Sequence, residues 1–130
     1  MHRAILTLLL ALLSHSAAAQ WVEVGDTGNA TVYVDPATIR RAGSMVKMGT
    51  LYDLKTAVVS KTNGKRYLSQ KMQTEYDCRE ARWRMLHFSW HSGNMGGGEM
   101  VESLSDSYKW EPVPPGSGVE ILWQLACGRK

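Results

Sequence analysis

The sequence predicts an α+β fold, in which an antiparallel sheet of about six strands carries a C-terminal helix on one face. Apolar and polar residues alternate along much of residues 21–104, which is the pattern of half-buried strands. Near the C-terminus the apolar spacing lengthens to that of an amphipathic helix. Cys78 and Cys127 are the two cysteines of the chain, and we expect a disulfide between them to join the helix to the sheet.

The first part of the expected sheet contains two short strands and a turn. The alternation places the strands at residues 21–24 and 31–34, and the Asp-Thr-Gly-Asn composition of residues 26–29 is typical of a turn. The Asp-Pro pair at residues 35–36 resembles a helix cap followed by a first-turn proline. We therefore expect one helical turn over residues 37–41.

The third expected strand covers about residues 45–53. Val46, Met48 and Tyr52 fall on one of its faces, which we expect to be the buried face. Residues 56–60 either extend this strand or begin another.

Asn63-Gly64 is the clearest hairpin signal in the chain, because both residue types tolerate the positive φ angles of a two-residue type I′ turn. The strand after it covers about residues 66–78. Its inward face is expected to carry Leu68, Met72, Tyr76 and Cys78. Its polar face carries Lys71, Gln73 and Glu75. We expect the carboxylates of Glu75 and Asp77 to be solvated.

A further strand is expected over about residues 81–91. Strict alternation places Leu86, Phe88 and Trp90 on one face and Trp83, Met85 and His87 on the other. Residues 92–98 form a glycine-rich loop, and residues 100–104 are a candidate sixth strand.

The last expected element is an amphipathic helix. Three prolines and a glycine within residues 112–116 end any preceding strand. Ser117 and Glu120 then fit a capping box, and Gly128 is a C-terminal stop. One helical stripe contains Val119, Leu122, Trp123, Ala126 and Cys127. The second cysteine is therefore expected on the buried side of the helix.

Residues 1–19 have the features of a cleaved secretory signal peptide. Residues 1–3 are basic, residues 4–13 are apolar, and residues 17–19 form a small-residue cleavage site. The apolar run is shorter than the roughly 20 residues of a membrane-spanning helix. We expect residues 20–130 to form a single exported domain. The periplasm is the leading location, with secretion or the cell surface as alternatives.

The charge balance gives no argument for a nucleic-acid partner. Removal of Arg3 with the signal peptide leaves 14 basic and 12 acidic residues. The basic residues are scattered, with one local cluster at Arg79, Arg82 and Arg84, which we expect to be a solvated strand edge. The cysteines lack the C-x-x-C spacing of a redox-active pair, so we expect a structural bond.

Several short motifs resemble the surface-adhesin protein E family of Gram-negative bacteria. They are Trp21, Tyr-Val-Asp at residues 33–35, Glu-Tyr-Asp-Cys at residues 75–78, the segment from Trp to Ser at residues 110–117, and Cys127. The resemblance implies a six-stranded antiparallel sheet with a C-terminal helix held by a disulfide. It also implies a dimerising surface lipoprotein that binds host extracellular-matrix or plasma proteins and has a link to haem. No cysteine lies near the expected cleavage site, so a lipid anchor is not expected here.

Two sets of residues are candidate sites. His91, Met95 and Met100 surround three consecutive glycines, and imidazole and thioether ligands suit Cu(I) or haem iron. His87 and His91 alone do not suggest zinc, because four residues of strand span about 13 Å.

The stripe of Trp83, Met85 and His87 is the second candidate. If the helix covers the opposite face of the sheet, this stripe is free to bind a protein partner or a second copy of the chain.

No sequence motif indicates an enzyme. The chain lacks G-x-S-x-G, a P-loop, G-x-G-x-x-G and any triad-like arrangement. We therefore expect a non-catalytic exported binding module. The alternatives are a small periplasmic haem or copper carrier that uses the loop from His91 to Met100, and a structural envelope protein without a small-molecule ligand.

Overall fold

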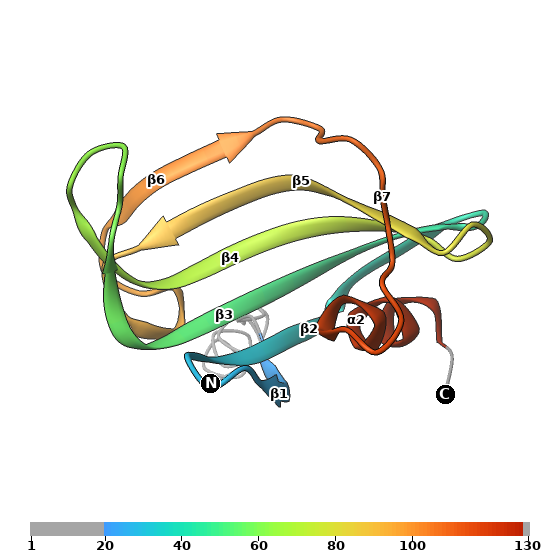
Figure 1. The fold of residues 1–130 in the computed structure, drawn as a ribbon, viewed down its shortest axis with the longest axis horizontal. Helices are drawn as coiled ribbons and strands as arrows, with labels where there is room; N and C mark the ends of the chain where they lie inside the picture. The colour runs from blue at the N-terminus through green and yellow to red at the C-terminus, as the bar shows by residue number, and fades with distance from the viewer. Residues whose placement is uncertain (1–19, 129–130) are drawn as a thin grey trace, which may run out of the picture.

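The computed structural model describes residues 20–128. The expected signal peptide therefore lies outside the described residues, as do residues 129–130. The described chain forms one antiparallel sheet and one α-helix (Figure 1). The strands are β1 (Val22–Asp26), β2 (Ala30–Ala42), β3 (Met45–Val59), β4 (Arg66–Asp77), β5 (Arg82–His91), β6 (Met100–Ser105) and β7 (Glu111–Pro112). A short 3₁₀ turn, η1 (Asn94–Gly96), precedes β6, and the helix α2 spans Gly118–Cys127.

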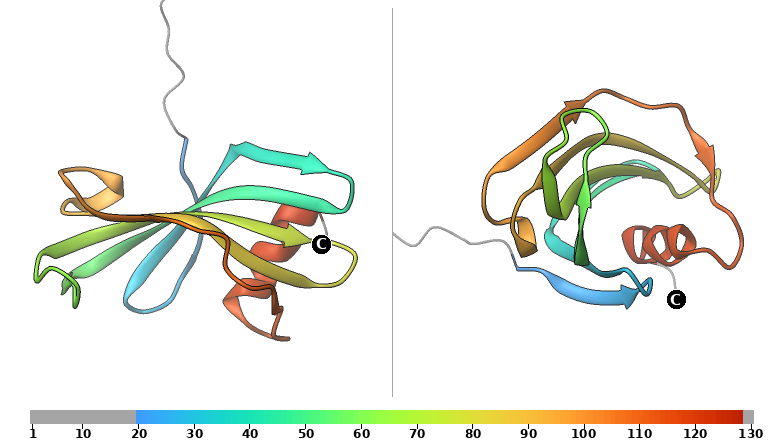
Figure 2. Two further views of the ribbon diagram at one scale, coloured as in Figure 1. Left: turned by 90° about the horizontal axis from the view of Figure 1, so that it is seen from above. Right: turned by 60° about the vertical axis from the view of Figure 1, so that its left-hand side comes forward.

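The predicted fold class is confirmed. The strands pair in chain order from β1 to β6, and the two-residue β7 pairs with β5 beyond the end of β6. Pro112 is tolerated in β7 because this strand lies at the sheet edge, where a missing N–H donor costs little. The sheet is curved, and α2 lies against its inner side (Figure 2).

The predicted helical turn over residues 37–41 is wrong, because this segment belongs to β2. The pairing of β2 with β3 shifts register between Asp35 and Arg40. Asp35 Oδ1 accepts a hydrogen bond from the Ala37 N–H at 3.0 Å, and the Thr38 hydroxyl donates to the Asp35 carbonyl at 2.6 Å. The local hydrogen bonds of the Asp side chain therefore support an irregularity within a strand instead of a helix start.

The hairpin at Asn63-Gly64 is present, but its turn is not the predicted type. β3 continues to Val59, and only Gly64 of the pair has positive φ, at 73°. The Ser60 N–H donates to the Lys65 carbonyl at 2.8 Å, and the Gly64 N–H donates to the Ser60 carbonyl at 2.9 Å. The loop is thus longer than two residues, and glycine alone provides the left-handed conformation.

A β-bulge at Leu86 overturns the predicted faces of β5. Thr74 of β4 pairs with Met85, whereas the preceding Gln73 pairs with His87, so Leu86 has no partner. Adjacent residues of β4 point to opposite faces, and directly paired residues share a face. Met85 and His87 are therefore on opposite faces of the sheet, because one extra residue breaks the period-two alternation.

The helix buries the stripe that the sequence predicts. Leu122 and Ala126 of α2 are buried in a core cluster with β-strand side chains. The strand members of this cluster are Val32, Val34, Val46, Met48 and Tyr76. Ser117 caps the helix by accepting from the Glu120 N–H at 3.2 Å. The return bond of the capping box goes to the Gly116 N–H, which donates to Glu120 Oε1 at 3.3 Å.

The predicted disulfide is confirmed. Cys78 follows β4, Cys127 ends α2, and their Cα atoms are 5.6 Å apart. A hydrogen bond of 2.9 Å from the Trp123 indole N–H to the Asp77 carbonyl joins the same two elements. The helix is therefore held at one end of the sheet by a covalent and a polar contact.

We predict that replacing both cysteines with alanine lowers the free energy of unfolding by up to about 4 kcal/mol. The reason is that the bond closes a loop of 49 residues and restricts the unfolded chain. Urea denaturation of the oxidised wild type and the double variant measures the difference. Equal midpoints and slopes for the two proteins would contradict the prediction.

Candidate functional site

The part of the sheet that extends beyond α2 carries a groove of about 560 Å³ on the helix side. Trp83, Phe88 and Trp90 pair with Tyr76, Met72 and Gln70 of β4, which places them on the face that packs against the helix. The groove is lined by Gln70, Trp83, Met85, Phe88, Trp90, Tyr108, Lys109 and Glu111. The bulge at Leu86 is what brings Trp83 and Met85 onto the same face as Phe88 and Trp90.

Four aromatic side chains line this aromatic groove: Trp83, Phe88, Trp90 and Tyr108. Phe88 and Trp90 meet edge to face with centroids 4.4 Å apart. Tyr108 lies 5.9 Å from Phe88, and Tyr67, which is outside the lining, lies 5.9 Å from Trp90. Phe88 is buried, whereas Tyr108 is 43% exposed and forms the accessible rim. Such a lining can bind apolar or aromatic side chains of a partner.

The structure brings together two of the three residues of the predicted interaction stripe. Trp83 and Met85 both line the aromatic groove, and Trp83 also packs against the core. His87 lies on the opposite face, where its Nδ1 contacts the Ser105 hydroxyl. The sequence could not predict this arrangement, because no feature of the β5 sequence marks Leu86 as an unpaired residue.

The opposite face has a pocket of about 400 Å³, which we call the polar pocket because most of its lining residues are polar. It is lined by Trp21, Asp35, Thr38, Gly49, Lys71, Met72, Gln73, His87, Ser89, His91 and Met100. One row across the sheet consists of Asp35, Gly49, Gln73 and His87, and Gly49 leaves a gap in this row. Thr38 covers part of the gap, since a Cβ on Gly49 would lie 3.0 Å from the Thr38 hydroxyl oxygen.

His91 and Met100 line this polar pocket together. They pair across β5 and β6, and His91 is buried with its Nε2 at 2.8 Å from the Ser89 hydroxyl. Burial lowers the pKa of His91, and the positive charge of Lys71 lowers it further. The neutral imidazole is therefore favoured, which is the form that ligates metals.

Met95 is not brought to that pocket. Its backbone N–H donates to Asp53 Oδ1 at 2.7 Å, and its side chain is exposed. Within residues 20–128 there is no group of three or more His, Cys, Asp or Glu residues that could hold a metal ion. Of the predicted trio, the structure brings together His91 and Met100 alone.

The expected solvated carboxylates are buried instead. Asp77 pairs with Arg82 at 2.9 Å, and Glu75 pairs with Arg84 at 2.7 Å. Both guanidinium groups also lie over the Trp110 ring, at 4.6 and 4.5 Å from its centroid. The arginines therefore fasten the segment after β6 to the sheet and do not form a free charged edge. A sequence pattern could have predicted these ion pairs, because Glu-x-Asp at the end of one strand is followed by Arg-x-Arg at the start of the next.

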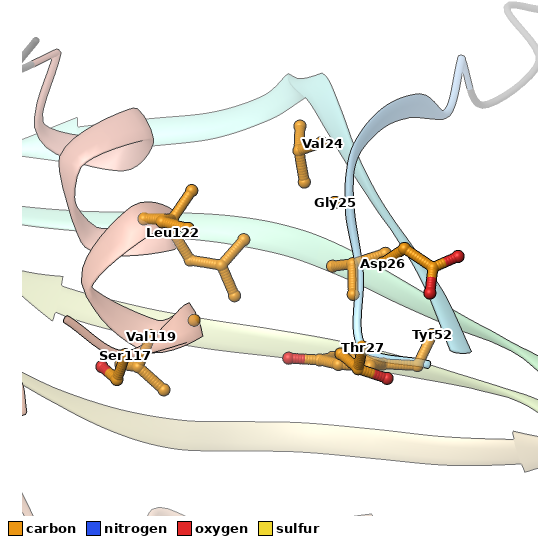
Figure 3. Close-up of a pocket in the computed structure, with 11 residues that line it drawn as sticks. Val24, Gly25, Asp26, Thr27, Tyr52, Ser117, Val119 and Leu122 are labelled. Carbon is orange, nitrogen blue, oxygen red and sulfur yellow. The ribbon is translucent and has the colours of Figure 1, made fainter. Parts of the chain in front are cut away.

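A smaller pocket of about 250 Å³ separates β1 from the start of α2 (Figure 3). Val24 faces it from β1, and Val119 and Leu122 face it from the helix. The Asp26 carboxylate points away from the helix and pairs with Lys55 at 3.0 Å. The pocket is a mainly apolar space at the edge of the core and presents no set of polar groups for catalysis.

A family model described as Surface-adhesin protein E matches residues 21–128. The chain belongs to the surface-adhesin protein E family. Membership of this family indicates an exported or cell-surface protein. No curated protein matches the sequence. In residues 20–128, no helix has the length and apolar character needed to cross a membrane.

Solved structures of protein E from Haemophilus influenzae share the fold of this family member. Crystal form II has a TM-score of 0.68 at 12% sequence identity, with 87% of this chain and 91% of that chain covered. A structure of protein E from non-typeable Haemophilus influenzae has a TM-score of 0.66 at 12% identity and covers 87% and 78% of the two chains. At 12% sequence identity, the similarity to these structures shows a shared fold.

We predict that Asp77→Asn lowers the free energy of unfolding at pH 7 by about 1–3 kcal/mol, because a buried charged hydrogen-bond acceptor is lost. Burial alone would raise the pKa of Asp77, but hydrogen bonds from the Glu80 and Arg79 N–H groups and from Arg82 hold it below its ordinary value of 3.8. The ionised carboxylate therefore stabilises the fold above pH 3.8, and this contribution disappears as the pH falls through the lowered folded-state pKa.

Urea denaturation across the acid range checks this prediction. The difference between wild type and Asp77→Asn should shrink below pH 3.8. Asp106→Asn is the control, because Asp106 is an exposed aspartate and should show little difference at any pH. A difference for Asp77→Asn that is constant with pH would show that its charge is not responsible.

Proposed function

We propose that this chain is a non-catalytic, exported binding module that engages a protein partner through the aromatic groove. The main observation in support of this function is that four aromatic side chains line a partly exposed groove on the helix side of the sheet. The chain is also a member of a surface-adhesin family. Aromatic side chains that are apolar yet carry one polar atom are typical of protein interfaces.

The lining of the groove supports binding more than catalysis. Its titratable side chains are Tyr108, Lys109 and Glu111, and it contains no histidine, cysteine or serine. A nucleophile paired with a base is therefore absent from this lining. The charged residues Lys109 and Glu111 belong to the polar rim that surrounds the apolar centre of a typical interface.

The partner proposed for the groove is a host extracellular-matrix or plasma protein, as the family resemblance implies. We propose export to the periplasm or onward to the cell surface, and binding of a host protein requires the second location. A second copy of the chain is the alternative occupant of the groove, and a measured mass in solution distinguishes the two.

We predict that Tyr108→Glu weakens partner binding at least tenfold, because it places a charge at the accessible rim of an apolar contact. Leu125→Glu is the matched control, since Leu125 is also 43% exposed but lies on α2 outside the groove. Binding to a panel of immobilised matrix and plasma proteins gives the readout, and light scattering reports self-association.

Loss of binding or of dimers in Tyr108→Glu but not in Leu125→Glu would support the groove as the interface. Equal behaviour of the two variants, or a monomeric wild type that binds no panel member, would contradict it. Trp83→Glu is unsuitable for this test, because Trp83 packs against the core and its loss would affect folding.

A second candidate function, copper or haem carriage, is favoured by the pairing of His91 with Met100 in the polar pocket. An imidazole and a thioether are both ligands that Cu(I) and haem iron accept. Met95 is not near them, so these two residues would provide the ligands from this chain.

We predict for this second function that Met100→Ala weakens binding of Cu(I) or hemin, whereas Met95→Ala leaves it unchanged. Titration followed by absorbance measures both. Wild-type dissociation constants weaker than about 10 μM, or equal effects of the two substitutions, would exclude the site.

A further inference from the structure

A long segment of the chain that contains no acidic residue forms the β3–β4 hairpin. Residues 54–74 include five basic residues and no aspartate or glutamate. The basic residues are Lys55, Lys61, Lys65, Arg66 and Lys71. The small net charge of the whole chain conceals this concentration, because the acidic residues lie elsewhere in the sequence.

The charges at the hairpin tip are free of ion pairs. Lys61, Lys65 and Arg66 are exposed, and none of them belongs to an ion pair within residues 20–128. Lys55, in contrast, is neutralised by Asp26 at 3.0 Å. Glu102 is a second acidic residue that contacts the hairpin, and it accepts from the Ser60 hydroxyl at 3.2 Å at the base of the loop.

Two apolar side chains adjoin these charges. Val58 and Val59 are 42% and 56% exposed, which is unusual for consecutive valines at a strand end. Val58 pairs with Tyr67 and Val59 pairs with Arg66. The tip therefore combines two exposed valines with a group of cations, and we name residues 58–67 the basic hairpin.

The basic hairpin lies at one end of the molecule. In Figure 1 its green loop lies at the left-hand end of the long axis, whereas α2 lies in the right-hand half, near the β2–β3 and β4–β5 turns that form the other end. The Asn63 side-chain N–H donates to the Val101 carbonyl at 3.1 Å, and the Ser60 contact with Glu102 adds a second tie to β6. A flat surface can thus meet a preformed tip without approaching the helix.

We propose that the basic hairpin binds the surface of an anionic phospholipid membrane. Lysine and arginine are attracted to anionic headgroups, and their stems lie along the apolar boundary while the charges stay in water. The exposed valine side chains gain by leaving water at the acyl boundary. A soluble polyanion such as a sulfated glycan would use the cations, but the exposed valines would add nothing to that contact.

Co-sedimentation with vesicles tests the proposal with the full chain, purified after export. The probes are vesicles of phosphatidylcholine alone and of phosphatidylcholine mixed with phosphatidylglycerol. Each basic residue near an anionic surface contributes roughly fivefold in affinity, so the triple variant Lys61→Gln, Lys65→Gln, Arg66→Gln should bind the mixed vesicles roughly 100-fold more weakly. Added salt should weaken wild-type binding, because it screens the attraction.

A matched control removes three charges from the other end of the sheet. Arg40, Arg41 and Lys47 are also exposed and lie near the β2–β3 turn, and their replacement by glutamine should leave binding nearly unchanged. Val58→Ser with Val59→Ser should weaken binding although the charge is unaltered. All variants keep the same N-terminal segment, so differences between them report on the hairpin.

The opposite results would overturn the proposal. Equal losses in the two triple variants would show that overall charge, and not the hairpin, governs binding. Absence of wild-type binding to mixed vesicles, or binding to immobilised heparin without binding to vesicles, would also reject a membrane partner. Wild-type affinity of the Val58→Ser, Val59→Ser variant would show that the valines do not enter the membrane, and would contradict the proposed contact.

Discussion

One unpaired residue in β5 determines which face of the sheet each side chain of this strand occupies. The bulge at Leu86 places Trp83 and Met85 on the same face as Phe88 and Trp90, and it sends His87 to the other side. Without it, strict alternation would divide the aromatic residues between the two faces. An apolar groove forms on the helix side because of this shift, and the opposite face carries His87 and His91.

The position of the helix determines how much of the apolar face stays accessible. Cys127 is bonded to Cys78, and Trp123 donates to the Asp77 carbonyl, so α2 is fixed near one end of β4. A ten-residue helix spans about 15 Å. It therefore covers Tyr76 and its neighbours and leaves the part of the face around Phe88 to the aromatic groove.

The basic residues at the two ends of the sheet differ in whether they have acidic partners. Near the end of β4, Arg82 and Arg84 each have a buried carboxylate partner, and both lie over the Trp110 ring. Near the other end, Lys61, Lys65 and Arg66 of the basic hairpin have no such partner among residues 20–128. The same residue type thus fastens a loop at one end of the molecule and remains available to an external anion at the other.

The sequence alone determined the elements whose signals are local. The approximate positions of the main strands, the Ser117 cap with its helical stripe, and the pairing of the two cysteines follow from local patterns and cysteine count, and the structure confirms them. Side-chain hydrogen bonds that suit a helix cap also suit an irregular strand, so residues 37–41 required the pairing of β2 with β3 to decide between them.

Only the tertiary structure decided the sites. Which residue of β5 lacks a partner depends on the register against β4, and no local propensity of Leu86 specifies it. The separation of Met95 from His91, and the pairing of buried carboxylates with arginines, likewise depend on segments that meet only after folding. Local periodicity reports which residues are apolar, whereas the face that each one occupies is set by long-range pairing.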